Sequence, residues 1–131
     1  MAVQVELKRI IITETSDQQV IYLKEVTGER SFPIVIGSTE ALAIDRRLKG
    51  QPTPRPQTHE LLSSVIEKLE GKLERIVIND LQDHTIFARL VVRQNGKTVE
   101  IDSRPIDAIA LGVAYNVPIF VAEHVMDEVG G

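Results

Sequence analysis

The chain of 131 residues has no cysteine and no tryptophan, and only 4% of its residues are aromatic. Without cysteine it can form no disulfide, no CxxC redox pair, no thiolate nucleophile and no cysteine-based zinc site. This composition is typical of the reducing cytoplasm, where we expect the protein to be located. The few aromatic side chains also leave little surface on which nucleic-acid bases could stack.

Long apolar runs are absent as well. The longest, Ala108 to Tyr115, is far shorter than the roughly 18 residues that a membrane helix needs. The first residues, MAVQVELKRIIIT, alternate apolar and polar side chains and lack the apolar centre and cleavage site of a signal peptide. We therefore expect a soluble protein that is neither exported nor held by a membrane.

The balance of charge is slightly acidic, with a net charge of −4 and a pI near 5.4. No overall positive field attracts a polyanion, which argues against nonspecific, charge-driven binding to nucleic acid. Any contact with nucleic acid would depend on a local patch. One candidate patch comprises Arg46, Arg47, Lys49 and Arg55, which fall within ten residues that contain no acid.

The pattern of apolar residues predicts an α+β fold. Seven segments have strand character: residues 3–13, 19–26, 32–36, 73–81, 85–93, 98–101 and 117–122. Asn95-Gly96 predicts a tight hairpin turn, because both residues tolerate a positive φ. About three packed helices are expected, at 38–50, 58–70 and 105–115, with a short helix in the tail from 123. Hairpin connections favour a mixed, largely antiparallel sheet in one compact domain, with its core at about 5–123.

The first two predicted helices flank a proline-rich connector, residues 51–57. For the helix at 38–50, Ser38 or Thr39 is the expected N-cap. Its expected apolar face consists of Ala41, Leu42, Ile44 and Leu48. For the helix at 58–70, the apolar residues that recur with helical spacing are Leu61, Leu62, Val65, Ile66 and Leu69.

The motifs of several common enzyme classes are missing. Neither the phosphate loop GxxxxGK[ST] nor GxGxxG occurs, and no GxSxG nucleophile elbow is present. His59-Glu60 begins like the zinc-protease motif HExxH, but Ser63 stands where the second histidine would be. The sequence therefore excludes these nucleotide-binding, serine-hydrolase and zinc-protease sites.

Three charged residues surround the start of the third predicted helix, in the stretch DSRPIDAIAL from Asp102 to Leu111. Apart from Asp107, residues 106–115 are small or apolar, which predicts a helix buried on most of its surface. Asp107 complements the helix dipole, and Asp102 and Arg104 could form a surface ion pair of small value. Alternatively, the two acids hold a divalent cation while Arg104 binds phosphate, as phosphodiester hydrolysis requires.

The other two helix starts also carry polar residues. Thr58, His59 and Glu60 begin the second helix, and His59 could be a solvated cap, a general base or a metal ligand. Glu40 in the first turn of the first helix is either a dipole complement or a metal ligand. Spacing alone does not bring these helix starts together.

Three blocks occur in order: Ile36 to Ile44, Arg55 to Leu61, and Asp102 to Leu111. Together they resemble the bifunctional nuclease family, over a region from Val5 to about Glu123. The resemblance implies a compact α+β domain that acts on DNA and RNA.

The three blocks contain the residues to which the nuclease hypothesis assigns roles. The predicted catalytic set is His59, Glu60, Asp102 and Asp107, the predicted phosphate-binding set is Arg55, Ser103 and Arg104, and the predicted metal set is Glu40, Asp102 and Asp107, for Mg²⁺ or Mn²⁺. Two positions depart from the usual family pattern. Glu60 stands where aspartate is frequent, and Ile106 stands where serine is usual.

Two hypotheses of different classes follow. In the first, the chain is a metal-dependent nuclease for DNA and RNA. In the second, it is a non-enzymatic binding or regulatory module whose charged helix ends form subunit contacts. In either case we expect a homo-oligomer, such as a dimer. A third possibility is the sensing of a small anion at the helix N-termini.

Overall fold

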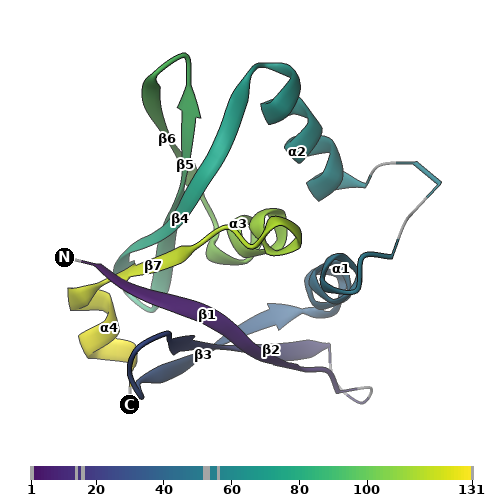
Figure 1. The fold of residues 1–131 in the computed structure, drawn as a ribbon. Helices are drawn as coiled ribbons and strands as arrows, with labels where there is room; N and C mark the ends of the chain where they lie inside the picture. The colour runs from purple at the N-terminus through teal and green to yellow at the C-terminus, as the bar shows by residue number, and fades with distance from the viewer. Residues whose placement is uncertain (1, 14, 16, 52–53, 56, 131) are drawn as a thin grey trace.

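The computed structural model describes residues 2–13, 15, 17–51, 54–55 and 57–130, and it confirms the α+β class (Figure 1). The strands are β1 (Ala2–Ile11), β2 (Gln18–Glu25), β3 (Ser31–Gly37), β4 (Gly71–Gln82), β5 (Thr85–Gln94), β6 (Lys97–Ser103) and β7 (Ile119–Ala122). The helices are α1 (Ser38–Leu48), α2 (Thr58–Lys68), α3 (Pro105–Gly112) and α4 (Glu123–Val129), with a 3-10 turn at Val113–Tyr115. The described residues thus form four α-helices rather than about three, because the tail forms a complete one.

A single mixed sheet holds all seven strands in the order β3-β2-β1-β7-β4-β5-β6. Every neighbouring pair is antiparallel except β4 and β7, which run parallel. The predicted hairpin turn at Asn95-Gly96 is confirmed, since these residues have φ values of 50° and 76°. Asp83 and His84, with φ values of 50° and 67°, form a similar turn between β4 and β5.

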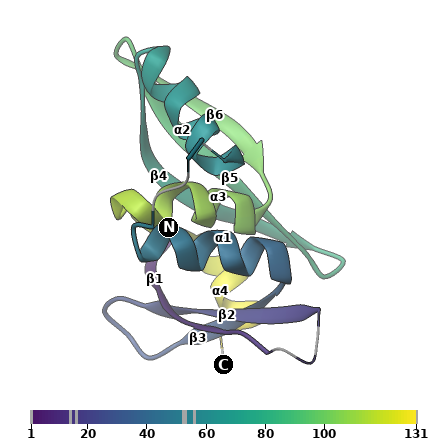
Figure 2. The same cartoon turned by 90° about the vertical axis from the view of Figure 1, so that its right-hand side faces the viewer.

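The third helix lies at the centre of the molecule. α3 packs against α1, α2, β4 and β5, and Figure 2 shows it between α1 and α2. All its residues except Pro105 and Asp107 are buried, as the apolar sequence predicts. A Cβ built on Gly112 would lie only 2.7 Å from Ile76 Cδ1 and 3.1 Å from Val117 Cβ. Glycine therefore allows α3 to approach β4 closely.

The first helix differs from the prediction in its cap and in its apolar face. Its N-cap is Gly37, without a side-chain hydrogen bond, rather than Ser38 or Thr39. The Ser38 hydroxyl instead donates to the Asp17 carbonyl oxygen at 3.3 Å. The buried residues are Ala41, Ile44 and Arg47, whereas Leu42 and Leu48 are half exposed. The inward face therefore runs i, i+3, i+6 and ends on an arginine.

Arg47 is buried because its guanidinium donates hydrogen bonds to carbonyl oxygens at the C-terminal end of α3. Its Nε donates to the carbonyl oxygen of Ala110 at 2.5 Å, and its Nη2 donates to that of Leu111 at 2.7 Å. The last carbonyls of an α-helix have no partner within the helix, so a guanidinium there supplies missing donors and complements the dipole. Arg47 therefore fixes α1 against α3.

The second helix also departs from the expected pattern. None of its eleven residues, all of which are described, is buried. Of the apolar residues named for this segment only Ile66 packs against the core, and the other four are exposed. Glu70 takes a positive φ, 65°, just after the helix.

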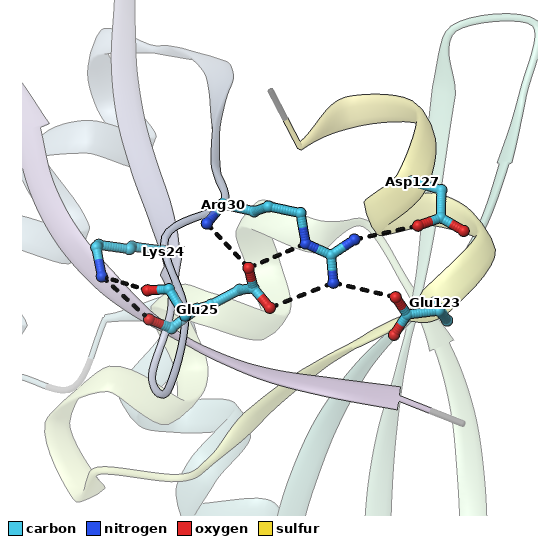
Figure 3. Close-up of polar contacts among 6 residues, drawn as sticks. Lys24, Glu25, Arg30, Glu123 and Asp127 are labelled. Carbon is cyan, nitrogen blue, oxygen red and sulfur yellow. Dashed lines mark hydrogen bonds and ion pairs between the residues drawn. The ribbon is translucent and has the colours of Figure 1, made fainter.

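A group of ion pairs connects the chain near its end to the turn between β2 and β3 (Figure 3). Arg30 lies 2.9 Å from Glu25, 3.0 Å from Glu123 and 3.1 Å from Asp127. Because Glu123 and Asp127 belong to α4, Arg30 joins this helix to the hairpin. Within the described part of the chain, no helix is long and apolar enough to cross a membrane.

Candidate active site

One side of α1, the first turn of α2 and the start of α3 border one open hollow of about 620 Å³. Its charged and titratable lining residues are Glu40, Arg46, His59, Arg104 and Asp107. We call it the N-terminal hollow. It brings together polar residues from all three helix starts, which spacing in the sequence could not establish.

Arg104 and Asp107 are joined across the first turn of α3. Arg104 Nε donates to Asp107 Oδ2 at 2.7 Å, and Arg104 Nη2 donates to Asp107 Oδ1 at 3.1 Å. This bond, followed by the charge of Asp107 and a smaller contribution from Glu40, raises the pKa of Arg104 above its ordinary value. A guanidinium has five N–H donors, so three of them remain for another anion. The sequence had suggested Asp102 as the ion-pair partner instead.

His59 lies on the other side of the same carboxylate. Its Nε2 is 3.7 Å from Asp107 Oδ1, which is too long for a hydrogen bond but close enough for charge attraction when the imidazole is protonated. The His59 side chain is only 16% exposed, while that of Arg104 is 71% exposed. Asp107 thus stands between a mostly buried imidazole and an accessible guanidinium.

Glu40 folds back over the start of its own helix. A Cβ built on Gly37 would lie 2.7 Å from Glu40 Oε1, so any side chain at position 37 would displace this carboxylate. The φ of Gly37, −78°, is one that any residue can adopt, so its backbone conformation does not require a glycine. The glycine makes room for an acid at the N-terminus of α1, where the helix dipole favours negative charge.

A second hollow lies between α2, the start of α3 and β6, and we call it the sheet-side hollow. It shares Thr58, His59, Arg104 and Asp107 with the first hollow, and adds Leu62, Ile66, Leu90, Ile101, Asp102 and Ser103. Ser103 uses its hydroxyl to donate to the Arg104 carbonyl oxygen at 2.8 Å. The proton of this hydroxyl is therefore directed at the backbone rather than at the hollow.

Asp102 borders the sheet-side hollow, but the register of β6 turns it away from Asp107. It pairs with Arg89, whereas Ile101 pairs with the buried Leu90. Directly opposite residues of an antiparallel pair share a face, and successive residues alternate. The side chain of Asp102 therefore belongs to the face that carries Arg89, opposite the face under α2 and α3.

Two other predicted site residues are not among those lining either hollow. Glu60 points to Arg47, with Nη1 and Oε1 3.8 Å apart. Arg55 is exposed in the connector before α2. The structure thus associates His59, Arg104 and Asp107 most closely, and Glu40 lines the same N-terminal hollow.

The predicted metal ligands are not arranged as one set. Within residues 2–13, 15, 17–51, 54–55 and 57–130, no three histidine, aspartate or glutamate side chains are placed to hold one metal ion. Both oxygens of Asp107 accept bonds from Arg104, and Asp102 belongs to another face of the sheet. In this arrangement the residues do not fit a three-ligand metal site, and a metal requirement stays a prediction.

The proposed basic patch does not form a common surface. Arg47 is buried against α3, Lys49 pairs with Asp45 at 2.9 Å, and Arg46 donates to the Gln57 side chain. Arg46 nevertheless lines the N-terminal hollow, together with Leu42 and Leu61. Sequence reasoning placed Arg46 in the basic patch but not among the helix-start residues, and it assigned neither leucine to a site. The cluster of basic residues around Arg46, which is in the last turn of α1, was the available signal for this residue.

Ile106, which departs from the usual serine, is 8% exposed and belongs to the hydrophobic core. Its side chain points inward while that of Asp107 reaches the hollow. A serine at position 106 would therefore have its hydroxyl on the side of the core and not on the side of the hollow.

The fold and the hollow define a single-domain α+β protein whose polar site lies where three helix N-termini meet. The chain belongs to the bifunctional nuclease domain family, whose model matches residues 20–131. Uncharacterized proteins from two strains of Mycobacterium tuberculosis are 35% identical over 127 residues, which cover 97% of this chain and 76% of theirs. Bifunctional nuclease 1 of Oryza sativa subsp. indica is 23% identical over 114 residues, which cover 84% of this chain and 34% of the rice protein.

Proposed function

We propose that this protein hydrolyses phosphodiester bonds in DNA and RNA at the N-terminal hollow, and that it does so in the cytoplasm. The observation that carries the proposal is the grouping of His59, Arg104 and Asp107 at one hollow in a member of a nuclease family. An arginine for the phosphate and a histidine for proton transfer are the groups that such a reaction uses.

Each of the three residues has a distinct task in the proposed reaction. Arg104 directs its remaining N–H groups to the non-bridging phosphate oxygens and neutralises their charge. His59 takes a proton from a water molecule as the water oxygen bonds to phosphorus and the bond to the leaving oxygen breaks. The leaving oxygen receives a proton from solvent or from the His59 imidazolium. Asp107 stabilises the imidazolium and keeps Arg104 oriented.

We propose that the reaction requires a divalent cation, Mg²⁺ or Mn²⁺. When bound, such an ion would neutralise phosphate charge and activate water. Glu40, Asp102 and Asp107 are the acids that the sequence suggests as its ligands. Because these acids do not form one ligand set in this arrangement, no step is assigned to the ion.

The test is a cleavage assay on single- and double-stranded DNA and RNA, each with Mg²⁺, Mn²⁺ or EDTA. His59→Ala is expected to lower the rate by about 10²–10⁴, the usual contribution of a general acid or base. His124→Ala is the matched control, because His124 Nε2 also lies near a carboxylate, 3.3 Å from Asp80 Oδ1, but outside both hollows. If both variants cleave like the wild type, the activity does not arise at His59 and the proposal fails.

A non-enzymatic binding module is the second candidate function. The observation in its favour is that Arg104 and Asp107 already satisfy one another in the resting protein. In that case the purified protein would bind nucleic acid or another anion without cleaving it under any of the ionic conditions. The same assay, followed by a binding measurement on the uncleaved substrates, separates the two functions.

A further inference from the structure

A third open hollow, of about 720 Å³, lies beside the N-terminal hollow. It is bordered by strand β3, by the beginning of β5 with the turn before it, and by the start of α3, and we call it the β3 hollow. Glu40 and Arg104 line both hollows, so the two hollows adjoin at these side chains. Arg104 also lines the sheet-side hollow. All three hollows therefore meet at one exposed guanidinium, at the start of the helix that Figure 2 shows beside α1.

The walls of the β3 hollow combine apolar surface with hydrogen-bonding groups. Pro33, Val35, Ile86 and Pro105 are among its apolar lining residues, and Val35 is 60% exposed. β3 is the first strand of the sheet, so one of its edges has no neighbouring strand among the described residues and offers backbone N–H and C=O groups. A nucleobase has apolar faces and a polar edge, and such walls suit both. The volume lies within the roughly 300–1,000 Å³ of pockets that bind small organic ligands.

His84 is a lining residue of the β3 hollow that the proposed hydrolysis does not use. It is exposed in the turn between β4 and β5, and its imidazole makes no hydrogen bond or ion pair to another residue in the described part of the chain. An imidazole ring can stack on a base, and its two nitrogens can donate and accept hydrogen bonds. His84 thus places an accessible aromatic ring beside the apolar wall, in a chain that has few aromatic residues.

We infer that the β3 hollow binds the base of a nucleotide whose phosphate lies at Arg104, and that His84 contacts this base. The inference rests on the proposed nuclease function, because it assigns the neighbouring hollow to the same substrate. The carboxylate of Glu40, between the two hollows, accepts hydrogen bonds from a sugar hydroxyl or from the amino group of a base. Groups for proton transfer, for phosphate and for a base then follow one another from His59 through Arg104 to His84.

Other occupants fit the β3 hollow less well. Arg104 is the one lysine or arginine among its described lining residues, so a free phosphate would find a single cation and mostly apolar walls. A fully paired duplex is also a poor occupant, since a base inside the hollow cannot pair with its complement. The substrate should therefore have an unpaired nucleotide next to the bond that is cleaved.

The binding of adenosine and uridine 5′-monophosphate, each compared with ribose 5-phosphate, tests the inference by calorimetry or NMR titration. None of these compounds contains a phosphodiester bond, so the measurement does not depend on cleavage. At least one nucleotide should bind about tenfold or more tightly than the sugar phosphate, as expected for one stacked base. Arg104→Gln should weaken the binding of all three compounds and leave this ratio unchanged, because it removes only the partner of the phosphate.

His84→Gly should lower the ratio to about threefold or less, because it removes the ring that contacts the base. Glycine adopts a positive φ readily, so the turn at position 84, where φ is 67°, should keep its conformation. Asn95→Gly is the matched control and should leave the ratio unchanged. Asn95 takes a φ of 50° in the other hairpin turn and is not among the residues that line the three hollows.

Four results would overturn the inference. They are no measurable binding of either nucleotide, equal binding of nucleotide and sugar phosphate, a ratio that is unchanged in His84→Gly, and equal cleavage rates on single-stranded and fully paired DNA of one sequence. A protein that cleaves nucleic acid without preferring the nucleotides refutes the inference and leaves the nuclease proposal intact. A protein that prefers the nucleotides, loses this preference in His84→Gly and cleaves nothing supports the inference and refutes the hydrolysis.

Discussion

Arg104 and Asp107 form a two-point contact across the first turn of α3, with nitrogen-to-oxygen distances of 2.7 and 3.1 Å. The contact orients the guanidinium before any anion arrives and still leaves it exposed to the hollow. Orientation in advance reduces the conformational entropy lost on binding. Asp107 also lies 3.7 Å from His59, so one carboxylate organises both of the other proposed site residues.

Replacing Asp107 should therefore affect cleavage much more than replacing Asp102. Asp107→Asn removes the charge that holds Arg104 and faces His59, and we expect cleavage to fall by about 10² or more. Asp102→Asn changes a side chain on the other face of the sheet, and we expect a loss below about tenfold. Steady-state rates of the two variants on one substrate give the comparison. Equal losses would show that Asp102 reaches the site after all.

Arg47 provides a prediction about stability. Arg47→Met keeps much of the side-chain volume but leaves the carbonyl oxygens of Ala110 and Leu111 without their donors. Buried unpaired polar groups cost about 1–3 kcal/mol, and we expect the free energy of unfolding to fall by that amount. Urea denaturation measures it.

Lys49→Met is the control for Arg47→Met, because Lys49 is 58% exposed and makes only an i, i+4 pair with Asp45. The expected change is about 0.5 kcal/mol or less. If Arg47→Met proved as mild as Lys49→Met, the contact between α1 and α3 would owe its stability to apolar packing alone.

The sequence was informative wherever a local pattern decides the structure. Asn95-Gly96 specified a hairpin turn through backbone conformation, and the apolar stretch from Ile106 onward specified a buried helix. The faces of α1 and α2 could not be predicted in the same way. Arg47 is buried because carbonyl oxygens 63 and 64 residues later accept its N–H groups, which no helical period reveals. Leu61 is exposed although its spacing is that of a core position.

The residues of the candidate site could be predicted from the sequence, but which of them lie together could not. Helix starts identified Glu40, His59, Arg104 and Asp107, because acids and capping groups gather where backbone N–H groups lack partners. Their meeting at one hollow depends on the packing of α1 and α2 around α3, which is set by contacts distant in sequence. The side of the sheet that Asp102 occupies depends on the register of β6 with β5. Asp102 and Asp107 therefore belong to one sequence motif but do not lie in one site.

Two glycines should respond differently to the same substitution. At Gly112, an added Cβ meets Ile76 and Val117 in the core, so Gly112→Ala should cost about 1–3 kcal/mol through overpacking. At Gly37, the added Cβ meets only the flexible end of Glu40, so Gly37→Ala should change stability by less than about 1 kcal/mol. Denaturation curves measure both values. A larger loss at Gly37 than at Gly112 would mean that Glu40 is fixed in its place rather than movable.

The pH dependence of stability should reflect the contact between Arg30 and Glu25. The Arg30 hydrogen bonds hold the pKa of Glu25 below its ordinary 4.5, so the unfolded chain takes up this proton more readily than the folded one. The stabilisation is therefore complete above about pH 4.5 and is lost as the pH falls through the folded pKa. Glu25→Gln should lower the melting temperature at pH 7 but converge with the wild type in strong acid, and 1 M salt should narrow the difference at pH 7. Thermal unfolding followed by circular dichroism from pH 2 to pH 7 measures this. A difference that is the same at every pH would mean that Glu25 stabilises the hairpin through packing and not through its charge.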